Sequence, residues 1–565
     1  MELSILGNRI VTQGSSLERA EVLKLPGAGP RADGTISMPL NIMSLTLLKE
    51  LFNITSTSQE LTKWVMDFQR IERLGEVIHD GTIEAKDYSP DLWEDQALAI
   101  ERILRYGSLG LFDDRGKGKT RVVLEAIRRS QADGARKAIV VTSRRLRSVW
   151  RRDCERWWAA DQIVLPEGRI WSEAADQIGD ATITVVTYQA LLNADVVKAI
   201  KELDPYFAIV EEAHNVKKRA RTNKKVDARG RVTRTPTLSG AVRKLPGTVR
   251  IAVTGTPMPN YWWEVWPLLN FVAPHEFSSF WQMIEVVGKV TENYWGGKDI
   301  DSRVLRPELW YRMMNRWTVR RERTGRNTIW DFVPVELSSK ERVAYRSMQK
   351  DMIVEQDGMV LDAKNVLDQA TKLQQLAGGL GTWKTWVDGD GIMRSRYSIS
   401  APSSKTEVLL DMLRGLHRAV VFTRFRNRAE FVASEIEKEL EVEAIVISGG
   451  QTENMTDQLL DRFMHDEVPL VAVCVFGTIS EGVNELVAAQ DVFFLDWITV
   501  SQVEQAVDRL DRPGQKGQVR AVTLYSTGTV DELAIDRERN KVIPLRIAIR
   551  SKDGWRYLVD FNSRE

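Results

Sequence analysis

A glycine-rich segment near the first fifth of the chain has the residue types that bind phosphate. It runs Leu111-Phe-Asp-Asp-Arg-Gly-Lys-Gly-Lys-Thr120, between an apolar strand end and a helical pattern from Arg121 to Arg129. Backbone N–H groups at glycines and at a helix start form a concave anion site. An ordinary surface turn would explain a lone Gly-Lys-Thr tripeptide, but the flanking strand and helix favour a phosphate loop. The segment predicts ATP binding by Gly116, Gly118, Lys119 and Thr120, with Lys119 on the β- and γ-phosphates and the Thr120 hydroxyl on Mg²⁺.

Two adjacent carboxylates, Glu211 and Glu212, end a second apolar strand pattern that begins at Tyr206. A nucleotide hydrolase needs one carboxylate for the Mg²⁺ shell and another to orient or deprotonate the attacking water. Glu211 fits the first role and Glu212 the second. Solvated loop charges are the alternative for such a pair. The phosphate loop upstream favours the catalytic interpretation.

Residues 501–515 form a helical pattern that ends at a Pro-Gly pair and carries two arginines. Arg509 and Arg512 lie about one turn apart, so both guanidinium groups leave the same face and can converge on one anion. Their distance in sequence from the phosphate loop suggests a site completed between two lobes. Pairing with Asp508 and Asp511 on a solvated face is the alternative. The expected catalytic residues are thus Lys119, Glu212, Arg509 and Arg512.

Apolar, β-branched runs alternate with amphipathic helical stretches in two separate series. Buried parallel strands require this pattern, and it predicts an α/β fold with two lobes and right-handed crossovers. The first series is 139–142, 183–187, 208–211 and 251–254, and the second is 420–423, 444–448, 471–476, 492–496 and 521–525.

The motifs together resemble, in type and order, those of the Swi/Snf-type DNA translocase ATPases of helicase superfamily two. The N-terminal region is also faintly similar to the substrate-recognition domain of the annealing-helicase and branch-migration members. The resemblance implies two tandem RecA-like lobes, each a parallel sheet with helices on both faces. It covers about residues 90–540 and rests on Trp93 to Gln96, Asp113 to Thr120, Ala138 to Trp150, Val186 to Gln189, Glu211 to His214, Ala252 to Asn260, Ala419 to Thr423, Glu481 to Asn484 and Gln505 to Gln515.

The resemblance implies roles for further residues. Gln96 would lie near adenine, and Gly482 would contribute to the ATP site and, with Asn484, report its state. Thr254, Gly255 and Thr256 would couple hydrolysis to the DNA groove. Backbone contacts to DNA are implied for Ser143, Arg144, Arg145, Thr187, Tyr188 and Thr423.

Two departures from the family pattern concern the ATP site. Glu211 stands where the family has Asp, and its extra methylene changes how Mg²⁺ is reached. Arg115 and Lys117 lie in the phosphate loop where apolar residues are usual. These two side chains either add charge near the phosphates or face solvent, and we expect solvent.

The stretch from Asn215 to Gly247 is strongly basic, with eleven Lys or Arg residues against the single acid Asp227. Few apolar residues interrupt it, so we expect a mobile loop. Lys217 and Lys218 are its candidate contacts to a DNA backbone, and such contacts would weaken steeply with salt. A solvated loop without a partner is the alternative.

The expected domain organisation follows from these assignments. Residues 1–88 form a small accessory domain with a possible role in recognising the DNA substrate, and residues 89–335 form the ATP-binding lobe. Residues 336–400 form a helical linker or bridge, residues 401–540 the second lobe and residues 541–565 a tail. The adjacent Trp262 and Trp263, with Trp266 at helical spacing, are interpreted as packing residues.

Composition agrees with this organisation. The chain has 565 residues, 43% hydrophobic and 28% charged, with a net charge of +1, as in ordinary soluble proteins. Cys154 and Cys474 have no metal-ligand spacing and form no disulfide framework, which favours a reducing compartment. We find no secretory pattern and no apolar run of membrane-spanning length, so we expect a cytoplasmic or nuclear protein.

The sequence therefore predicts an ATP- and Mg²⁺-dependent translocase, a monomeric motor moving on double-stranded or forked DNA. Two alternatives remain open: an RNA-dependent helicase of the same superfamily, and a DNA-binding scaffold whose ATPase has decayed, for which Glu211 is the hint. Stimulation of ATP turnover by duplex DNA would distinguish the translocase from both alternatives.

Overall fold

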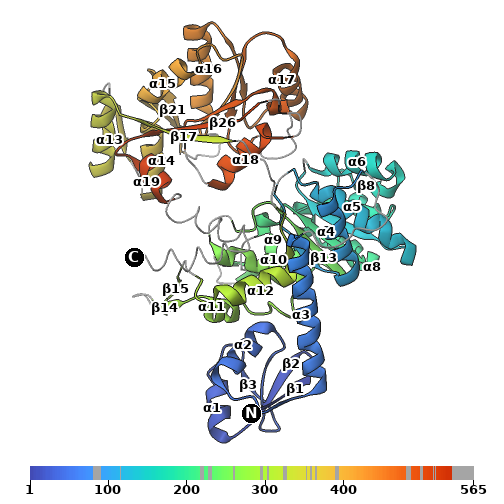
Figure 1. Cartoon of the computed structure of the whole chain (residues 1–565). Coiled ribbons are helices and arrows are strands. Elements are labelled where there is room, and N and C mark those ends of the chain that lie inside the picture. The colour runs from blue at the N-terminus through green and yellow to red at the C-terminus, as the bar shows by residue number, and fades with distance from the viewer. Residues whose placement is uncertain are drawn as a thin grey trace. The chain divides into compact units, whose positions relative to one another are not determined.

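The computed structural model (Figure 1) describes residues 1–80, 91–114, 116–144, 146–216, 222–226, 232–258, 261–292, 297–301, 304–321, 328–351, 353–356, 359–362, 366–387, 393–478, 485–496, 500–512, 515 and 517–537. The chain forms two compact units that divide between Arg323 and Thr324. This division lies ahead of the lobe boundary expected at residues 335/336. Each unit is described by itself.

The first unit is built around a sheet whose seven described strands all pair in parallel. Four of the strands match the first series of apolar runs in the sequence. The phosphate loop follows the short strand β6, and the carboxylate pair ends β10, two positions away in the same sheet. In spatial order the strands are β16 (Thr318–Val319), β6 (Leu109–Leu111), β13 (Val249–Val253), β10 (Phe207–Glu211), β7 (Ala138–Thr142), β9 (Ile183–Thr187) and β8 (Ile163–Val164).

Both faces of this sheet are buried, which explains why its strands are apolar at nearly every position. On β7, Ile139 and Val141 belong to one core, and Ala138 and Val140 belong to the other. The second of these cores is closed by α4 (Glu94–Tyr106), α5 (Lys119–Ser130) and α6 (Leu146–Trp157), and the first by α8 (Ala194–Leu203), α9 (Leu238–Val242) and α10 (Trp266–Val272).

The N-terminal region forms a small five-stranded sheet with three helices (Figure 1). Its apolar side chains, such as Leu3, Met38 and Leu48, share one core with Met283 and Met313 of the first unit. Its elements are β1 (Glu2–Leu6), β2 (Arg9–Gln13), α1 (Ser16–Leu23), β3 (Gly29–Pro30), β4 (Ile36–Pro39), α2 (Ile42–Leu51), β5 (Ser56–Thr57) and α3 (Gln59–Asp80), and they pack on α11 (Phe280–Val287) and α12 (Pro307–Trp317).

Buried hydrogen bonds tie this region to the rest of the first unit. The Asn41 side chain caps α2 and also donates to the Glu276 carbonyl and to Gln282 Oε1, at 3.1 and 3.2 Å. The backbone N–H of Ile42 donates to Glu276 Oε1 at 2.9 Å. Burial raises the pKa of the Glu276 carboxyl to about 7, although the Ile42 N–H and the nearby Arg316 act in the opposite direction.

This raised pKa makes folding stability depend on pH. A carboxyl whose pKa rises from 4.5 to about 7 on folding stabilises the protein below pH 4.5, and this contribution is lost as pH rises through 7. At about 1.4 kcal/mol for each pKa unit, the loss is roughly 3 to 4 kcal/mol. We expect Glu276→Gln, which keeps the acceptor for Ile42, to flatten the pH dependence of the free energy of unfolding between pH 5 and 8, measured with urea. Equal slopes in wild type and variant would contradict this assignment.

The second unit has a six-stranded sheet that is also parallel throughout its described strands. All five apolar runs of the second series in the sequence are strands of it, and its sixth strand, β17, precedes residue 336. In order the strands are β17 (Ile329–Val335), β26 (Arg520–Ser526), β25 (Asp491–Phe494), β22 (Arg418–Thr423), β24 (Leu470–Val475) and β23 (Glu443–Ile447). Two parallel sheets with helices packed on both faces confirm the fold class.

Helices cover both faces of the second sheet. One face packs on α15 (Ser404–Leu413) and α16 (Arg426–Leu440), and the other on α17 (Glu453–His465), α18 (Val500–Leu510) and α19 (Val530–Arg537). Residues 336–400, expected to form a helical linker or bridge, also contain two hairpins. They comprise α13 (Ser339–Asp351), β18 (Ile353–Gln356), β19 (Met359–Asp362), α14 (Val366–Leu376), β20 (Gly381–Val387) and β21 (Met393–Ile399).

The basic stretch of the first unit contains a hairpin as well. Within the described part of 215–247, β11 (Thr222–Val226) pairs antiparallel with β12 (Val232–Pro236), where we expected a loop. A second hairpin, β14 (Val290–Glu292) with β15 (Lys298–Ile300), follows α11. No helix among the described residues is long and apolar enough to cross a bilayer.

Candidate active site

The phosphate loop has two glycines in the left-handed backbone conformation. Gly116 and Gly118 both have positive φ, 78° and 68°, and Gly118 is the N-cap of α5. A Cβ on Gly118 would lie 2.4 Å from Gln96 Nε2. The left-handed conformation favours glycine at position 118, and a larger residue would also have to displace the end of the Gln96 side chain.

Side chains of the phosphate loop form polar contacts within the loop and with α4. Lys119 Nζ donates to the carbonyls of Asp113 and Asp114 at 2.9 and 3.1 Å, which places the ammonium group inside the loop. Lys117, expected to face solvent, instead forms a 3.1 Å ion pair with Asp95 of α4, and its side chain is 15% exposed. That expectation was wrong for Lys117 because α4 presents a carboxylate to the loop. Arg115 lies outside the described residues.

Gln96 is 4% exposed, and both ends of its amide form hydrogen bonds within the protein. Its Oε1 accepts the N–H of Trp93 at 3.1 Å, and its Nε2 donates to the Lys117 carbonyl at 3.1 Å. In this conformation Gln96 links the start of α4 to the phosphate loop.

The carboxylate pair leaves the carboxyl end of β10 in two directions. The Glu211 carboxylate accepts hydrogen bonds from the indole N–H of Trp150 on α6 and from the Thr142 hydroxyl at the end of β7. The Tyr188 hydroxyl donates to the Glu211 carbonyl at 2.5 Å. The longer Glu211 side chain is thus oriented by the neighbouring strands and by α6.

Glu212 is turned away from its neighbour by a positive φ of 48°, which is rare for a residue other than glycine and costs conformational energy. Its Oε2 lies 3.2 Å from His214 Nδ1. The same nitrogen lies 3.0 Å from Thr254 Oγ1 and 3.4 Å from Thr256 Oγ1. His214 therefore connects the second carboxylate to the Thr-Gly-Thr segment, which follows β13.

These residues fit ATP and Mg²⁺. The loop offers backbone N–H groups at a helix start and one ammonium group, which is the donor set for a triphosphate. Among the described side chains, no cluster of three or more His, Cys, Asp or Glu is placed to hold a metal ion. A Mg²⁺ ion held only by Thr120 and Glu211 would need phosphate and water oxygens as its remaining ligands, as Mg²⁺ commonly does.

The side chains expected to contact DNA are exposed to different degrees. Arg144 is exposed, and Ser143 and Thr187 are partly exposed. Tyr188 is 4% exposed and bonded to the Glu211 carbonyl. The hydroxyls of Tyr188 and Thr187 are used within the lobe, the latter as acceptor for the Ala190 N–H at 3.3 Å.

Thr423, at the end of β22 in the second unit, is fully buried. Its hydroxyl donates to Asp496 at 2.6 Å, and Arg428 donates to the same carboxylate at 2.6 Å. Burial alone would raise the pKa of Asp496, but the Arg428 and Lys405 charges and the Thr423 hydrogen bond hold it below its usual value. Thr423 thus orients the turn after β22, whose next residue, Arg424, is exposed.

Arg509 lies in the last turn of α18 and is 5% exposed, whereas Arg512 is half-buried just beyond the helix. Arg512 Nε donates to the Asp508 carbonyl at 3.0 Å. Four predicted site residues, Arg145, Lys217, Lys218 and Gly482, lie outside the described residues, as does Asn484.

Sequence reasoning missed several residues that build the site. Trp150 and Thr142 hold Glu211, and His214 joins Glu212 to Thr254. Arg321, two residues after β16, binds Asp113 across 208 positions of sequence.

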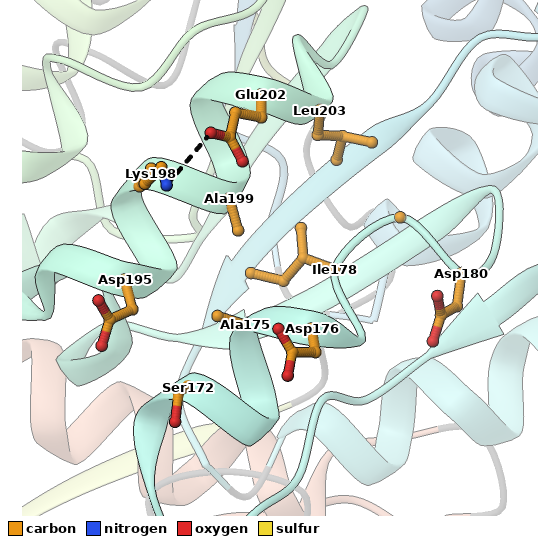
Figure 2. Close-up of a pocket in the computed structure, with 11 residues that line it drawn as sticks. Ser172, Ala175, Asp176, Ile178, Asp180, Asp195, Lys198, Ala199, Glu202 and Leu203 are labelled. Atoms are coloured by element: carbon orange, nitrogen blue, oxygen red, sulfur yellow. Dashed lines mark ion pairs between the residues drawn. The ribbon is translucent and has the colours of Figure 1, made fainter.

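One hollow in the first unit lies away from these residues. It has a volume of about 650 Å³ and is lined by α7 (Trp171–Asp176), α8 and the turn after α7. Figure 2 shows four carboxylates around it and one lysine, Lys198, which pairs with Glu202. A lining dominated by carboxylates repels phosphate, so this hollow fits neither a triphosphate nor a nucleic-acid backbone. The four acids are Asp176, Asp180, Asp195 and Glu202.

Comparisons with known proteins agree with the motifs. The profile of the SNF2-related domain matches residues 58–378, more than half of the chain. The putative ATP-dependent helicase/translocase YwqA of Bacillus subtilis is 24% identical, over 75% of this chain and 44% of its own length. The uncharacterized ATP-dependent helicase MG018 of Mycoplasma genitalium is 20% identical, over 76% of this chain and 39% of its own.

A human protein is similar to the same extent. The SWI/SNF-related matrix-associated actin-dependent regulator of chromatin subfamily A member 1 is 24% identical, over 70% of this chain and 37% of its own length. Among solved structures, the Sulfolobus solfataricus SWI2/SNF2 ATPase core in complex with dsDNA is 19% identical, covering 84% of this chain and 96% of that chain, with a TM-score of 0.36. The chain spans less than half the length of these three sequence relatives. By its domain match and its motifs, this chain belongs to the SNF2-related family.

Proposed function

We propose that this protein is an ATP-dependent translocase that moves on double-stranded DNA. The observation that carries the proposal is the placement of the phosphate loop and the carboxylate pair at the carboxyl edge of one parallel sheet, after β6 and β10. Ligands of open α/β sheets bind at that edge. Family membership supports the same activity, because its relatives are named ATP-dependent helicases and one is a probable ATP-dependent DNA helicase of Arabidopsis thaliana.

In the proposed reaction, the loop from Gly116 to Thr120 binds the phosphates, and the Lys119 ammonium group leaves the carbonyls of Asp113 and Asp114 to reach them. Bound Mg²⁺, held through Thr120 and Glu211, would supply charge neutralisation on the phosphates. Glu212 orients the attacking water and accepts its proton. Arg509 and Arg512 are the arginines that would stabilise the charge of the transferred phosphoryl group.

The coupling to DNA runs through His214 in this proposal. Its ring nitrogen contacts both the Glu212 carboxylate and the Thr254 hydroxyl, so a change at the hydrolysis site moves the Thr-Gly-Thr segment with it. Arg144 and the basic stretch around Lys217 and Lys218 are the proposed contacts to the DNA backbone. Such contacts carry no sequence information, so binding would be tolerant of sequence.

The decisive test is steady-state ATP hydrolysis without nucleic acid and with single-stranded DNA, duplex DNA, forked DNA or RNA. We expect duplex or forked DNA to stimulate turnover most. Stimulation by RNA alone would instead select an RNA-dependent helicase. Absence of hydrolysis under every condition would select a DNA-binding scaffold, and equal turnover with and without nucleic acid would remove the translocase proposal.

A further inference from the structure

An ion-pair chain that no motif of the sequence reveals runs beside the phosphate loop. The parallel pairing of β6 and β16 continues past both strands, because the Phe112 N–H donates to the Val319 carbonyl at 2.8 Å and the Asp114 N–H to the Arg321 carbonyl at 3.1 Å. This brings Arg321 against the residue that opens the loop, Asp113.

Arg321 engages both carboxylate oxygens of Asp113. Its backbone N–H donates to Asp113 Oδ1 at 2.8 Å, and its guanidinium Nη2 donates to Oδ2. Asp113 is 0% exposed and Arg321 is 6% exposed. Two charges so deeply buried are tolerable only as a pair, because removing one leaves the other without compensation.

The chain extends to α4 and back to the loop. Arg321 Nη1 lies 3.7 Å from Asp95 Oδ1, and the other oxygen of Asp95 pairs with Lys117 Nζ at 3.1 Å. The neighbouring Arg320 lies 3.6 Å from Asp114. Charges of opposite sign thus alternate from Lys117 through Asp95 and Arg321 to Asp113, from the middle of the loop to its first residue.

This arrangement acts on the lysine that meets the phosphates. The carbonyls of Asp113 and Asp114 are the two acceptors of Lys119 Nζ, and the Lys117 carbonyl is the acceptor of Gln96. Arg321 binds the side chain of Asp113. It also lies beside Asp95, which pairs with Lys117. The position of the loop backbone therefore depends on an arginine that touches no phosphate-binding residue of the motif directly.

We propose that Arg321 is a positioning residue for nucleotide binding, which presets the phosphate loop through Asp113 and Asp95. The proposal rests on the proposed ATPase function of the same site. This role differs from a purely stabilising one. Loss of Arg321 lowers the affinity of the folded protein for nucleotide, whereas loss of a purely stabilising residue would lower only the fraction of the protein that is folded.

The test compares Arg321→Ala, Arg321→Lys, Asp113→Asn and the double variant Asp113→Asn/Arg321→Ala. Affinity is read by fluorescence titration with an N-methylanthraniloyl-ADP probe and Mg²⁺, beside kcat and KM for ATP and the unfolding midpoint. We expect Arg321→Ala to raise Kd and KM about 10-fold with kcat within about threefold, because a displaced loop binds the ground state and the transition state more weakly to the same extent. Arg321→Lys restores part of the affinity, and the double variant is no weaker than the worse single one, because the residues act together.

The control is Arg105→Ala, which removes an exposed ion pair of α4 with Glu101 and should leave Kd unchanged. A folded Arg321→Ala protein with wild-type Kd and KM overturns the proposal, as does a fall in kcat alone. If Arg321→Ala does not fold, the nucleotide affinities of Asp95→Asn and Arg321→Lys test the proposal instead. If these two variants also fail to fold, the ion pairs have a structural role only and the proposal is overturned. Wild-type protein that binds no nucleotide would reject the proposed function itself, and this proposal with it.

Discussion

Replacing Glu212 with Gln is expected to reduce the kcat of ATP hydrolysis by about 10²- to 10⁴-fold, the usual contribution of a general base. The amide keeps the shape of the side chain and its contact to His214, but it cannot accept a proton from water. Because the phosphate loop is untouched, affinity for nucleotide and for DNA should stay within about threefold. Single-turnover hydrolysis with radiolabelled ATP, beside equilibrium binding, measures both quantities.

Glu202→Gln is the matched control for this variant. It makes the same chemical change on α8 of the same lobe, at a side chain that is 67% exposed. The control should hydrolyse ATP at the wild-type rate. Full turnover by Glu212→Gln would remove Glu212 from the catalytic role and direct attention to Glu211.

The second large effect is expected at Lys119, where Ala and Met test the charge separately from the length of the side chain. Both variants remove the ammonium group that the loop holds 2.9 and 3.1 Å from two carbonyls. A charged hydrogen bond contributes about 1.5 to 3 kcal/mol, so Kd for the ATP probe should rise about 10- to 100-fold. Hydrolysis should fall below detection, since the same charge stabilises the transferred phosphoryl group.

Lys198→Ala serves as the control, because it removes an exposed lysine of α8 with a side chain that is 76% exposed. Retained nucleotide affinity in Lys119→Met would show that the ammonium group is not a phosphate ligand. A loss of nucleotide affinity in Lys119→Ala but not in Lys119→Met would assign the effect to packing of the side chain and not to its charge. Binding of duplex DNA by both Lys119 variants, measured by fluorescence anisotropy, should stay close to wild type.

The chemistry of the site could be predicted from sequence because its residues are local to single strand ends. A phosphate loop needs glycines, a lysine and a hydroxyl within one turn, and Gly116 to Thr120 supply them in consecutive positions. The strands could be predicted for the same reason, since a strand buried on both faces is apolar at every position. Nine predicted runs are strands of the two sheets.

The burial of individual side chains and their bonding partners were harder to predict from the sequence. Lys117 was expected in solvent, yet Asp95 of α4 pairs with it. Tyr188 and Thr423 stood in segments matched to DNA contacts, yet both are buried and bonded within their own units. The hairpin of β11 and β12 was expected as a loop, because a basic sequence carries no period-2 apolar pattern to announce a strand.

The amino-acid order alone predicted which groups would act on a triphosphate and which strands carry them, since both depend on neighbours in the chain. Only the folded arrangement decided what holds those groups in place. Trp150 reaches Glu211 from α6, and Arg321 reaches Asp113 across 208 positions. Such contacts are made by the order of strands in the sheet, which places β16 beside β6, and no local pattern of residue types encodes that order.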